Sequence, residues 1–539
     1  MAKNHQYFSR KPLDMLLEEA KGENRLRRVL GPVALSSLGV GAIIGAGIFV
    51  STGAIARQTA GPALMLSYVA AGLVCIFAAL CYAEFASMVP VAGSAYTYAY
   101  ATLGELFAWI IGWDLVLEYA VGSAVVANGW SGYFQSVLSL LGITLPKALS
   151  GPVLQYSATS NNFMHLEPTG SLINLPAVLI VALVTIVLVV GIKESTRFNA
   201  TMVVVKLAAV LFVIGVGAFY INTANWTPFA PYGLTGLSFF GTPIAGQVDA
   251  AGRPLGMLAG AALAFFAYIG FDSVSTHAEE AKNPQRDVPI GIVASLVICT
   301  VLYIAVVAVL TGMVHYSQLD INAPVSEAFK QVGLPWAQGL IALAGVAGIT
   351  SVLLVMMLSQ PRVLLAMARD GLIPASFFGA VHEKFRTPYK STILTGIFVG
   401  ILAAFLPIDV LLELVNIGTL MAFVIVCAAV LIMRKKHPEA ERPFRAPFVP
   451  LVPILGIVTC SILMFSLPAY NWVRLAIWLG LGFVIYYLYG RKHSVMSKYN
   501  LAHELGTHGI SPGGQAVGDP NAPPDSPARP IDTEVKKDK

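Results

Sequence analysis

The chain has 539 residues, of which 56% are hydrophobic and only 12% are charged. An ordinary soluble domain carries about a quarter charged residues, so this composition argues against a water-soluble fold. The net charge of +5 is small, and no soluble domain is predicted that could carry a basic nucleic-acid surface. A membrane protein without a nucleic-acid partner is therefore expected.

Apolar runs long enough to cross a bilayer recur along the whole chain. A hydrocarbon core of about 30 Å takes roughly 20 apolar residues in a helix. Twelve such runs occur, and the third and eighth are long enough to tilt or to extend out of the membrane. The predicted spans are 33–57, 62–88, 102–138, 174–193, 199–221, 256–278, 288–314, 337–368, 391–407, 409–434, 449–467 and 473–490.

The basic residues predict the orientation, because Lys and Arg accumulate in cytoplasmic loops. With the N-terminus inside, all but six of the 34 basic residues fall on the cytoplasmic side. Both termini are therefore expected in the cytoplasm, and the twelve-span length favours a plasma (inner) membrane over an organelle. The exceptions are Arg57, Lys147, Arg253, Lys330 and Arg474, which lie outside, and Lys206, which lies inside the fifth span.

Two glycine- and aromatic-containing segments, 39–49 and 265–272, lie in the first and sixth spans. Five helices separate their starts, so the two segments run in opposite directions across the membrane. Transporters built from inverted repeats place broken helices in this way. The predicted divisions are an amphipathic or solvated cytoplasmic segment 1–30, a first repeat 31–222, an extracellular loop 223–255, a second repeat 256–434, two further spans 435–492 and a disordered tail 493–539.

The first of these segments holds Gly39, Gly41, Gly45 and Gly47. Each glycine in a helix interior costs about 1 kcal/mol relative to alanine, so the segment favours local unwinding where a ligand compensates. Unwound backbone offers N–H groups that suit a carboxylate and carbonyls that suit an ammonium, and a free α-amino acid has both. The alternative is close helix packing through small residues.

Three stretches resemble the amino acid–polyamine–organocation (APC) superfamily, and more narrowly the bacterial type of its cationic amino acid transporter branch. They are Gly-Ala-Ile-Ile-Gly-Ala-Gly-Ile-Phe at 41–49, the segment 82–96, and the run from Phe266 through Glu-Glu-Ala-Lys-Asn-Pro-Gln-Arg at 279–286. The resemblance covers about residues 20 to 490. It implies an all-α membrane protein of twelve transmembrane helices, with the five-plus-five inverted repeat of the LeuT/APC-like fold and broken helices 1 and 6.

The resemblance also implies a substrate site made mostly of backbone. The carboxylate of an amino acid would meet the amides of Gly45, Ala46 and Gly47. Its ammonium would meet carbonyls in both broken helices, which belong to Ile43, Phe266, Ala267 and Ile269, with Tyr268 in the same turn.

Met356 falls where the superfamily places a residue that contacts the substrate side chain. Methionine is apolar and pliable, so it would fill the space that a long cationic side chain needs. Small or medium neutral amino acids are therefore favoured over cationic ones. The alternative is an ordinary core or lipid-facing methionine beside Met357.

Lys206 is a bare charge at membrane depth, which is by default a functional hypothesis. An ammonium removed from water gives up its proton more readily than an exposed one. In relatives of this fold, a lysine at the matching place occupies the site that sodium fills in sodium-coupled members, near residues matching Gly41 and Ser351. Proton coupling is the implied mode, and a permanently charged lysine paired with a carboxylate is the alternative.

Glu118 lies midway along the third span, one turn beyond Asp114 and on the same face. It could pair with Lys206, carry the proton, or bind a cationic substrate, and the sequence leaves these three roles open. Asp272 closes the second broken segment, where capping, gating and substrate contact all remain open. The other carboxylates of interest lie at cytoplasmic helix ends, where solvated or loop-anchoring roles are expected; they are Glu84, Glu279 and Glu280.

These observations favour a proton-coupled importer of L-amino acids that works by alternating access, with cationic transport or exchange as alternatives. A membrane-embedded enzyme using Glu118, Asp114 and Asp272 is a competing class, and a non-transporting receptor is a third. No metal-ligand spacing and no phosphate-binding Gly-x-x-x-x-Gly-Lys-Ser/Thr segment occurs, so neither a metal site nor ATP-driven transport is expected. The prominent acidic groups lie at mid-membrane on separate helices, whereas an enzyme would gather them at an interface, so no enzyme activity is expected. A proton gradient is the expected energy source, without a cofactor. The expected partners are the amino acid and the lipid bilayer, and a small membrane subunit is left open.

Overall fold

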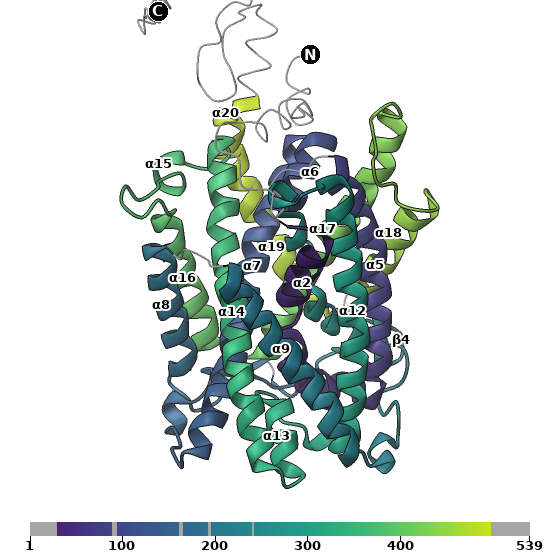
Figure 1. Ribbon diagram of the computed structural model, residues 1–539, viewed down its shortest axis with the longest axis vertical. Helices are drawn as coiled ribbons and strands as arrows, with labels where there is room; N and C mark the ends of the chain where they lie inside the picture. Colours follow the sequence, from purple (N-terminus) through teal and green to yellow (C-terminus); the bar gives the residue numbers. More distant parts are fainter. Residues whose placement is uncertain are drawn as a thin grey trace, which may run out of the picture.

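The structure is a computed structural model of the whole chain, and it describes residues 30–88, 94–160, 165–191, 196–239, 242–276 and 278–496. Its helices run roughly parallel to the long axis, and the last described helix, α20 (Arg491–His493), lies at one end of the bundle (Figure 1). The predicted amphipathic segment falls almost entirely outside the described residues, as does most of the predicted disordered tail.

Seven helical segments of the described chain are long and apolar enough to cross a membrane. Their lengths follow from the uninterrupted apolar runs read in the sequence, since a helix satisfies every internal backbone group within itself. Two of them, of 36 and 35 residues, are the long third and eighth spans. The α-helices that make up most of these seven segments are α5 (Leu64–Met88), α7 (Glu105–Leu140), α9 (Thr196–Gly217), α12 (Pro284–Met313), α14 (Pro335–Arg369), α17 (Ile408–Lys436) and α19 (Ala469–Ile485), the last of which is prolonged to His493 by two short helical turns.

Shorter apolar helices occupy the remaining predicted spans. Two of them, α2 (Pro32–Ile43) and α10 (Met257–Ala264), are short because their helices break where the sequence analysis expected it. The other three are α8 (Leu175–Val190), α16 (Tyr389–Phe405) and α18 (Leu451–Phe465). A membrane protein rich in apolar helices is thus confirmed.

Two helices were not anticipated, α6 (Ser94–Thr102) and α13 (Pro324–Gln331). Both are too short to span a membrane, and α13 places its apolar residues on one face. A search for runs of about 20 apolar residues passes over such segments.

The two long connections contain small hairpins. In the predicted loop 142–173, β1 (Leu154–Tyr156) pairs with β2 (Leu166–Pro168) in antiparallel register. The second loop holds two more antiparallel pairs, namely β3 (Leu237–Phe239) with β4 (Thr242–Ala245), and β5 (Gln247–Val248) with β6 (Pro254–Leu255).

Small residues allow the central helices to approach closely. A Cβ atom at Gly345 of α14 would lie 2.4 Å from the ring of Tyr133 on α7. A Cβ at Gly39 of α2 would lie 2.5 Å from the hydroxyl of Ser295 on α12. Packing through glycine is expected where lipid offers helices no hydrophobic reason to associate. The close approach at Gly39 packs α2 directly against α12, inside the bundle formed by the longer helices.

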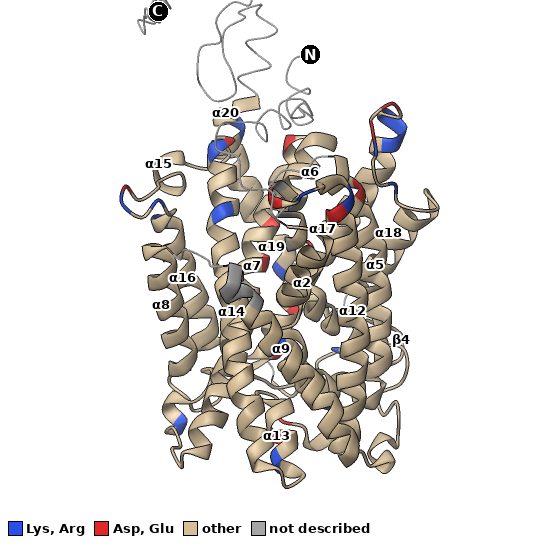
Figure 2. Cartoon of the chain, viewed as in Figure 1, with Lys and Arg blue, Asp and Glu red and all other residues tan. Residues whose placement is uncertain are grey.

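Charged side chains gather mostly at the end of the bundle that holds α20, while the flanks of the bundle are nearly free of charge (Figure 2). Large apolar side chains are exposed along those flanks, for example Ile186, Val301 and Leu488 at 62%, 62% and 69%. In water such a surface would aggregate, so its natural solvent is lipid.

Glu84 fastens the linker between α17 and α18 to the end of α5. Its carboxylate accepts hydrogen bonds from Arg434 Nε at 3.0 Å and Nη2 at 2.7 Å, and one from the Ala446 amide at 2.8 Å. Arg442 Nε lies 3.5 Å from the same carboxylate. Glu84 is only 2% exposed, so the loop-anchoring role left open in the sequence describes its position.

Replacing Glu84 by glutamine should lower the thermal unfolding midpoint of the detergent-purified protein by several degrees. The change leaves two arginines without their buried counter-ion, and breaking such a pair costs about 3 kcal/mol. Glu439→Gln, on the exposed part of the same linker, is the matched control and should leave the midpoint unchanged. Equal midpoints for Glu84→Gln and Glu439→Gln would contradict the anchoring role.

Candidate substrate site

The first break separates α2 from the short helix α3 (Ala46–Phe49). Gly45 adopts φ −169° and ψ −140°, and no side chain caps the start of α3. Within the described residues, no backbone bond engages the N–H groups of Gly45, Ala46 and Gly47. Free amides at the beginning of a helical segment suit a carboxylate.

The second break follows a 3₁₀ turn, Phe265–Tyr268, at the end of α10. Ile269 leaves helical geometry with ψ 131°, and Gly270 has φ +114°, a conformation that favours glycine. The chain resumes helical structure in α11 (Ser273–Thr276). Both predicted interruptions are therefore present as breaks in the backbone.

The two breaks touch each other. A Cβ at Gly47 would lie 2.2 Å from the Cα of Ala267, so no side chain fits between them. One hydroxyl bridges both, because Tyr303 donates to the carbonyl of Ile43 at 2.7 Å and to that of Ala267 at 3.2 Å. Two carbonyls that the resemblance assigned to an ammonium are thereby brought together, beside the free amides of α3.

Lys206 projects from α9 onto the end of α2, and it is only 2% exposed. Its Nζ donates to the carbonyl of Gly41 at 2.7 Å, one of the last carbonyls of α2 that has no partner in its own helix. A cation is favourable at the C-terminal end of a helix. Lys206 therefore contacts the first break through Gly41, as the resemblance implied.

Ser351 lies near the same lysine. The hydroxyl of Ser351 bonds the carbonyl of Gly348 at 3.2 Å, and a Cβ at Gly348 would lie 3.1 Å from Lys206 Cγ. Gly41, Ser351 and Lys206 thus form one region beside the first break. Among the residues that the structure describes, no carboxylate forms an ion pair with Lys206.

Val352 and Met356 lie on the face of α14 that points into the bundle. A Cβ at Gly45 would lie 2.6 Å from Val352 Cγ2, so Val352 covers the first break. Met356 is one turn further along α14 and 8% exposed, and its sulfur would lie 3.4 Å from a Cβ at Gly122 of α7. Met356 therefore faces the interior between α14 and α7.

Glu118 and Asp114 are buried on α7, at 5% and 1% exposed. Glu118 lies one helical turn beyond Asp114 on α7. Both carboxylate oxygens of Asp114 are buried without a hydrogen-bond partner in the described structure. They lie close to Gly418 of α17, where an added Cβ would be 2.5 Å from Asp114 Oδ1. The pairing of Glu118 with Lys206 that the sequence left open is not seen.

A buried cluster of charges joins the loop before α10 to the beginning of α17 and to α19. Arg253 Nε lies 2.6 Å from Glu413, and its Nη1 lies 3.6 Å from Asp409. Tyr470 of α19 donates to Glu413 at 2.6 Å. The sequence analysis placed Arg253 in a loop and gave no sign of these long-range partners.

Tyr156 of β1 extends this cluster. The guanidinium of Arg253 lies 4.9 Å from the centre of the Tyr156 ring, and the Tyr156 hydroxyl donates to Asp249 at 2.6 Å. Burial, together with the hydrogen bond to Asp249, raises the pKa of Tyr156, so the hydroxyl remains a donor at neutral pH.

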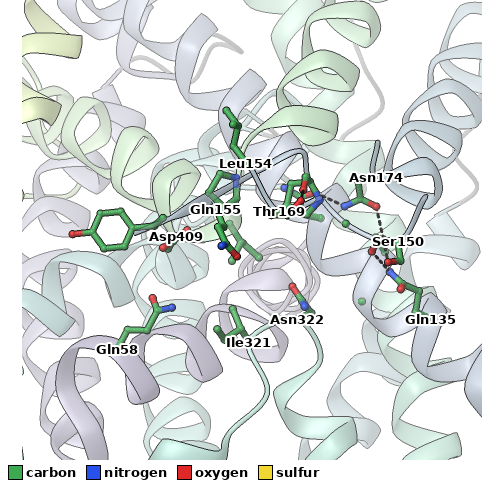
Figure 3. A pocket seen from close by; sticks show the side chains of 18 residues that line it. Gln58, Gln135, Ser150, Leu154, Gln155, Thr169, Asn174, Ile321, Asn322 and Asp409 are labelled. Atoms are coloured by element: carbon green, nitrogen blue, oxygen red, sulfur yellow. Dashed lines mark hydrogen bonds between the residues drawn. The ribbon is translucent and has the colours of Figure 1, made fainter. Parts of the chain in front are cut away.

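A polar pocket of about 270 Å³ lies next to Asp409. Figure 3 shows Gln58 and Asn322 on one side of it and Asn174 on another. The buried part of its lining is already hydrogen-bonded, since Asn174 donates to Asn128 at 2.8 Å and accepts from Ser131 at 2.7 Å. The pocket can hold a polar solute or water between the loops and α7.

The site also depends on tyrosines that sequence reasoning missed. Tyr303 bridges the breaks, Tyr68 of α5 donates to the carbonyl of Gly47 at 3.1 Å, and Tyr133 of α7 donates to that of Phe49 at 2.6 Å. The hydroxyl of Tyr268 donates to the carbonyl of Tyr68 at 2.8 Å, and the Tyr268 ring packs against those of Tyr68 and Tyr303. A tyrosine within an apolar run, whose hydroxyl needs a partner, was the available signal.

Comparison with known proteins identifies the family. Residues 30–489 match the amino acid permease family. The chain belongs to the amino acid permease family. As the sequence analysis expected, this permease is a multi-pass membrane transporter of the APC superfamily.

Named relatives of the permease extend over nearly its whole length. It is 47% identical over 492 residues to the branched-chain amino acid permease BcaP of Bacillus subtilis (strain 168), covering 91% of this chain and 99% of the relative. It is 45% identical over 491 residues to the methylthioribose transporter of the same organism, with the same coverage. The human cationic amino acid transporter 4 is 34% identical over 440 residues, covering 81% of this chain and 64% of the relative.

All three relatives are named as transporters or permeases, which favours transport over the membrane-embedded enzyme. In the described residues, no group of three or more His, Cys, Asp or Glu side chains is arranged to hold a metal ion.

Replacing Gly47 by alanine should destabilise the permease by about 1–3 kcal/mol, because the added methyl group overpacks the contact between the two breaks. The measurement is the thermal unfolding midpoint in detergent. Gly480→Ala is the matched control, since a Cβ at this glycine of α19 meets nothing within 4 Å. A Gly47→Ala midpoint as high as that of Gly480→Ala would show that the breaks are not in tight contact.

Proposed function

We propose that this permease imports neutral L-amino acids of small or medium size, and that it recognises the α-amino and α-carboxylate groups through the backbone of its two broken helices. The observation that carries the proposal is the meeting of free amides at Gly45–Gly47 with the carbonyls of Ile43 and Ala267. The carboxylate of an amino acid would bond the free amides, and its ammonium would bond the carbonyls that lie beside them.

The breaks support the five-plus-five inverted repeat with twelve transmembrane helices, in which residues 31–222 and 256–434 form the repeats. The segment 223–255 then lies outside the cell, and 435–492 supplies two additional helices. The concentration of charge at the end of the bundle that holds α20 supports the proposal of cytoplasmic termini and a plasma-membrane location (Figure 2).

The proposed energy source is a proton gradient that is coupled to transport through Lys206, so no cofactor is required. The lysine is buried, bonds the end of α2 at Gly41, and has no carboxylate partner among the described residues. Loss of its proton removes that charge-assisted bond and loosens α2 from α9. Protonation and the position of the first broken helix are thereby linked.

The preference for neutral side chains rests on Met356 and Val352, which present apolar surface from α14. The facing helix α7 carries one buried carboxylate in this part of the bundle, Glu118, four residues before Gly122, which Met356 approaches. The naming of one relative as a branched-chain amino acid permease supports an apolar substrate. The methylthioribose transporter is similar to nearly the same degree, so sequence similarity alone does not determine the substrate.

Uptake into proteoliposomes tests the function. Radiolabelled leucine should accumulate when the outside is acidic and the inside is neutral, and arginine and methylthioribose should not compete with it. The absence of accumulation for every neutral amino acid tested, or stronger accumulation of methylthioribose, would refute the proposal.

Lys206→Gln should abolish the response of leucine uptake to the pH gradient while leaving counterflow exchange measurable. The amide of glutamine can still donate to Gly41, but it does not bind a proton. Lys330→Gln, at an exposed lysine of α13, is the control and should respond like the wild type. If the Lys206→Gln variant still concentrates leucine in response to the pH gradient, a group other than Lys206 must carry the proton.

Met356→Ser should extend binding toward cationic amino acids, because it removes apolar volume and adds a hydroxyl where the substrate side chain would lie. Competition of arginine against labelled leucine should improve by about tenfold, equivalent to ~1.4 kcal/mol. The neighbouring Met357→Ser serves as the control. Unchanged arginine competition in Met356→Ser would refute the role of this residue.

A further inference from the structure

An apolar groove of about 720 Å³ lies on the flank of the bundle, outside the site described above. It is formed by α12, by Leu80 of α5, and by Pro443 and Phe444 of the linker that Glu84 anchors. Its long wall is one stripe of α12, in which Arg286, Pro289, Ile290, Val293, Ala294 and Val297 follow one another at helical spacing.

The stripe has one charged end and one apolar end. Arg286 lies in the first turn of α12, is exposed, and forms no ion pair with any described residue. The nearby Arg434 and Arg442 are committed to Glu84, so they do not compete with Arg286 for an anion. Beyond Arg286 the wall is apolar, and Ile290 and Val297 are 40% and 44% exposed.

The length of the stripe matches one leaflet of a bilayer. From Arg286 to Val297 the helix advances eleven residues, which at 1.5 Å per residue is about 16 Å. That is about half of the roughly 30 Å thickness of the hydrocarbon core. A ligand with its charge at Arg286 would therefore end near the middle of the membrane.

We propose that this groove is a binding site for one anionic phospholipid, whose phosphate meets Arg286 and whose acyl chain lies along α12 as far as Val297. The charge of Arg286 selects the anionic headgroup, and the apolar wall buries the chain. This site is separate from amino acid binding and does not depend on it.

The lipid would lie on the outer face of a helix whose inner face supports the first broken helix. On that inner face, a Cβ at Gly291 would lie 2.9 Å from Leu35 of α2, and Ser295 contacts Gly39. Occupancy of the groove therefore fixes α12 between the lipid and α2.

Native mass spectrometry of the full-length protein tests the site. The protein is titrated with phosphatidylglycerol and, separately, with phosphatidylcholine of the same acyl chains. The wild type should bind one phosphatidylglycerol more tightly than phosphatidylcholine. Arg286→Gln should weaken that phosphatidylglycerol by about fivefold and remove the headgroup preference, the effect of one lost cation at a membrane surface.

One further variant tests the contact with the acyl chain separately from the contact with the headgroup. Ala294→Trp fills the groove and should reduce tight binding of both lipids. The controls are Arg362→Gln, at an exposed arginine on α14, and Leu394→Trp, on the exposed face of α16, and both should bind as the wild type does.

Retention of the phosphatidylglycerol preference in Arg286→Gln, or of tight binding in Ala294→Trp, would overturn the proposal. Glycerol 3-phosphate, which has the charge but no chain, should not displace the lipid. Displacement by it at equal concentration would show a simple anion site.

Discussion

The structure depends on one constraint, which is that backbone polar groups inside a bilayer need hydrogen-bond partners. Each broken helix frees amides and carbonyls at membrane depth. The permease satisfies part of this need internally, through Lys206 on the Gly41 carbonyl, Tyr303 on Ile43 and Ala267, and Tyr68 on Gly47. The amides of Gly45–Gly47 have no backbone partner among the described residues, and we propose that the substrate bonds them.

This arrangement explains why recognition and movement can share the same residues. Lys206 and Tyr303 come from α9 and α12, so the breaks are tied to the helices around them by side chains rather than by continuous helix. A substrate that bonds the free amides and carbonyls adds to these ties. A site formed by backbone suits any α-amino acid, and under the proposed function the apolar side chains of Val352 and Met356 set the preference.

The long helices and the first break could be predicted from the sequence, whereas the contacts between distant residues could not. Apolar length predicted the long helices, and four closely spaced glycines predicted the first break, because both properties are local. The tyrosines that bridge the breaks, the Arg253–Glu413 pair and the bonds of Glu84 to Arg434 join residues far apart in the chain, so no local pattern reveals them. The short helix α13 was passed over because it lacks membrane length. The roles of Glu118 and Met356 still rest on the resemblance and on their position.

The central claim, that backbone groups hold both charged ends of an amino acid, is tested most directly by equilibrium competition against radiolabelled leucine on the purified permease. Isoleucine and valine should compete as leucine does. N-acetyl-leucine and leucine methyl ester each lack one charge and should compete about 10- to 100-fold more weakly, as expected for a lost hydrogen bond to a charged group. Equal competition by either derivative would contradict the claim.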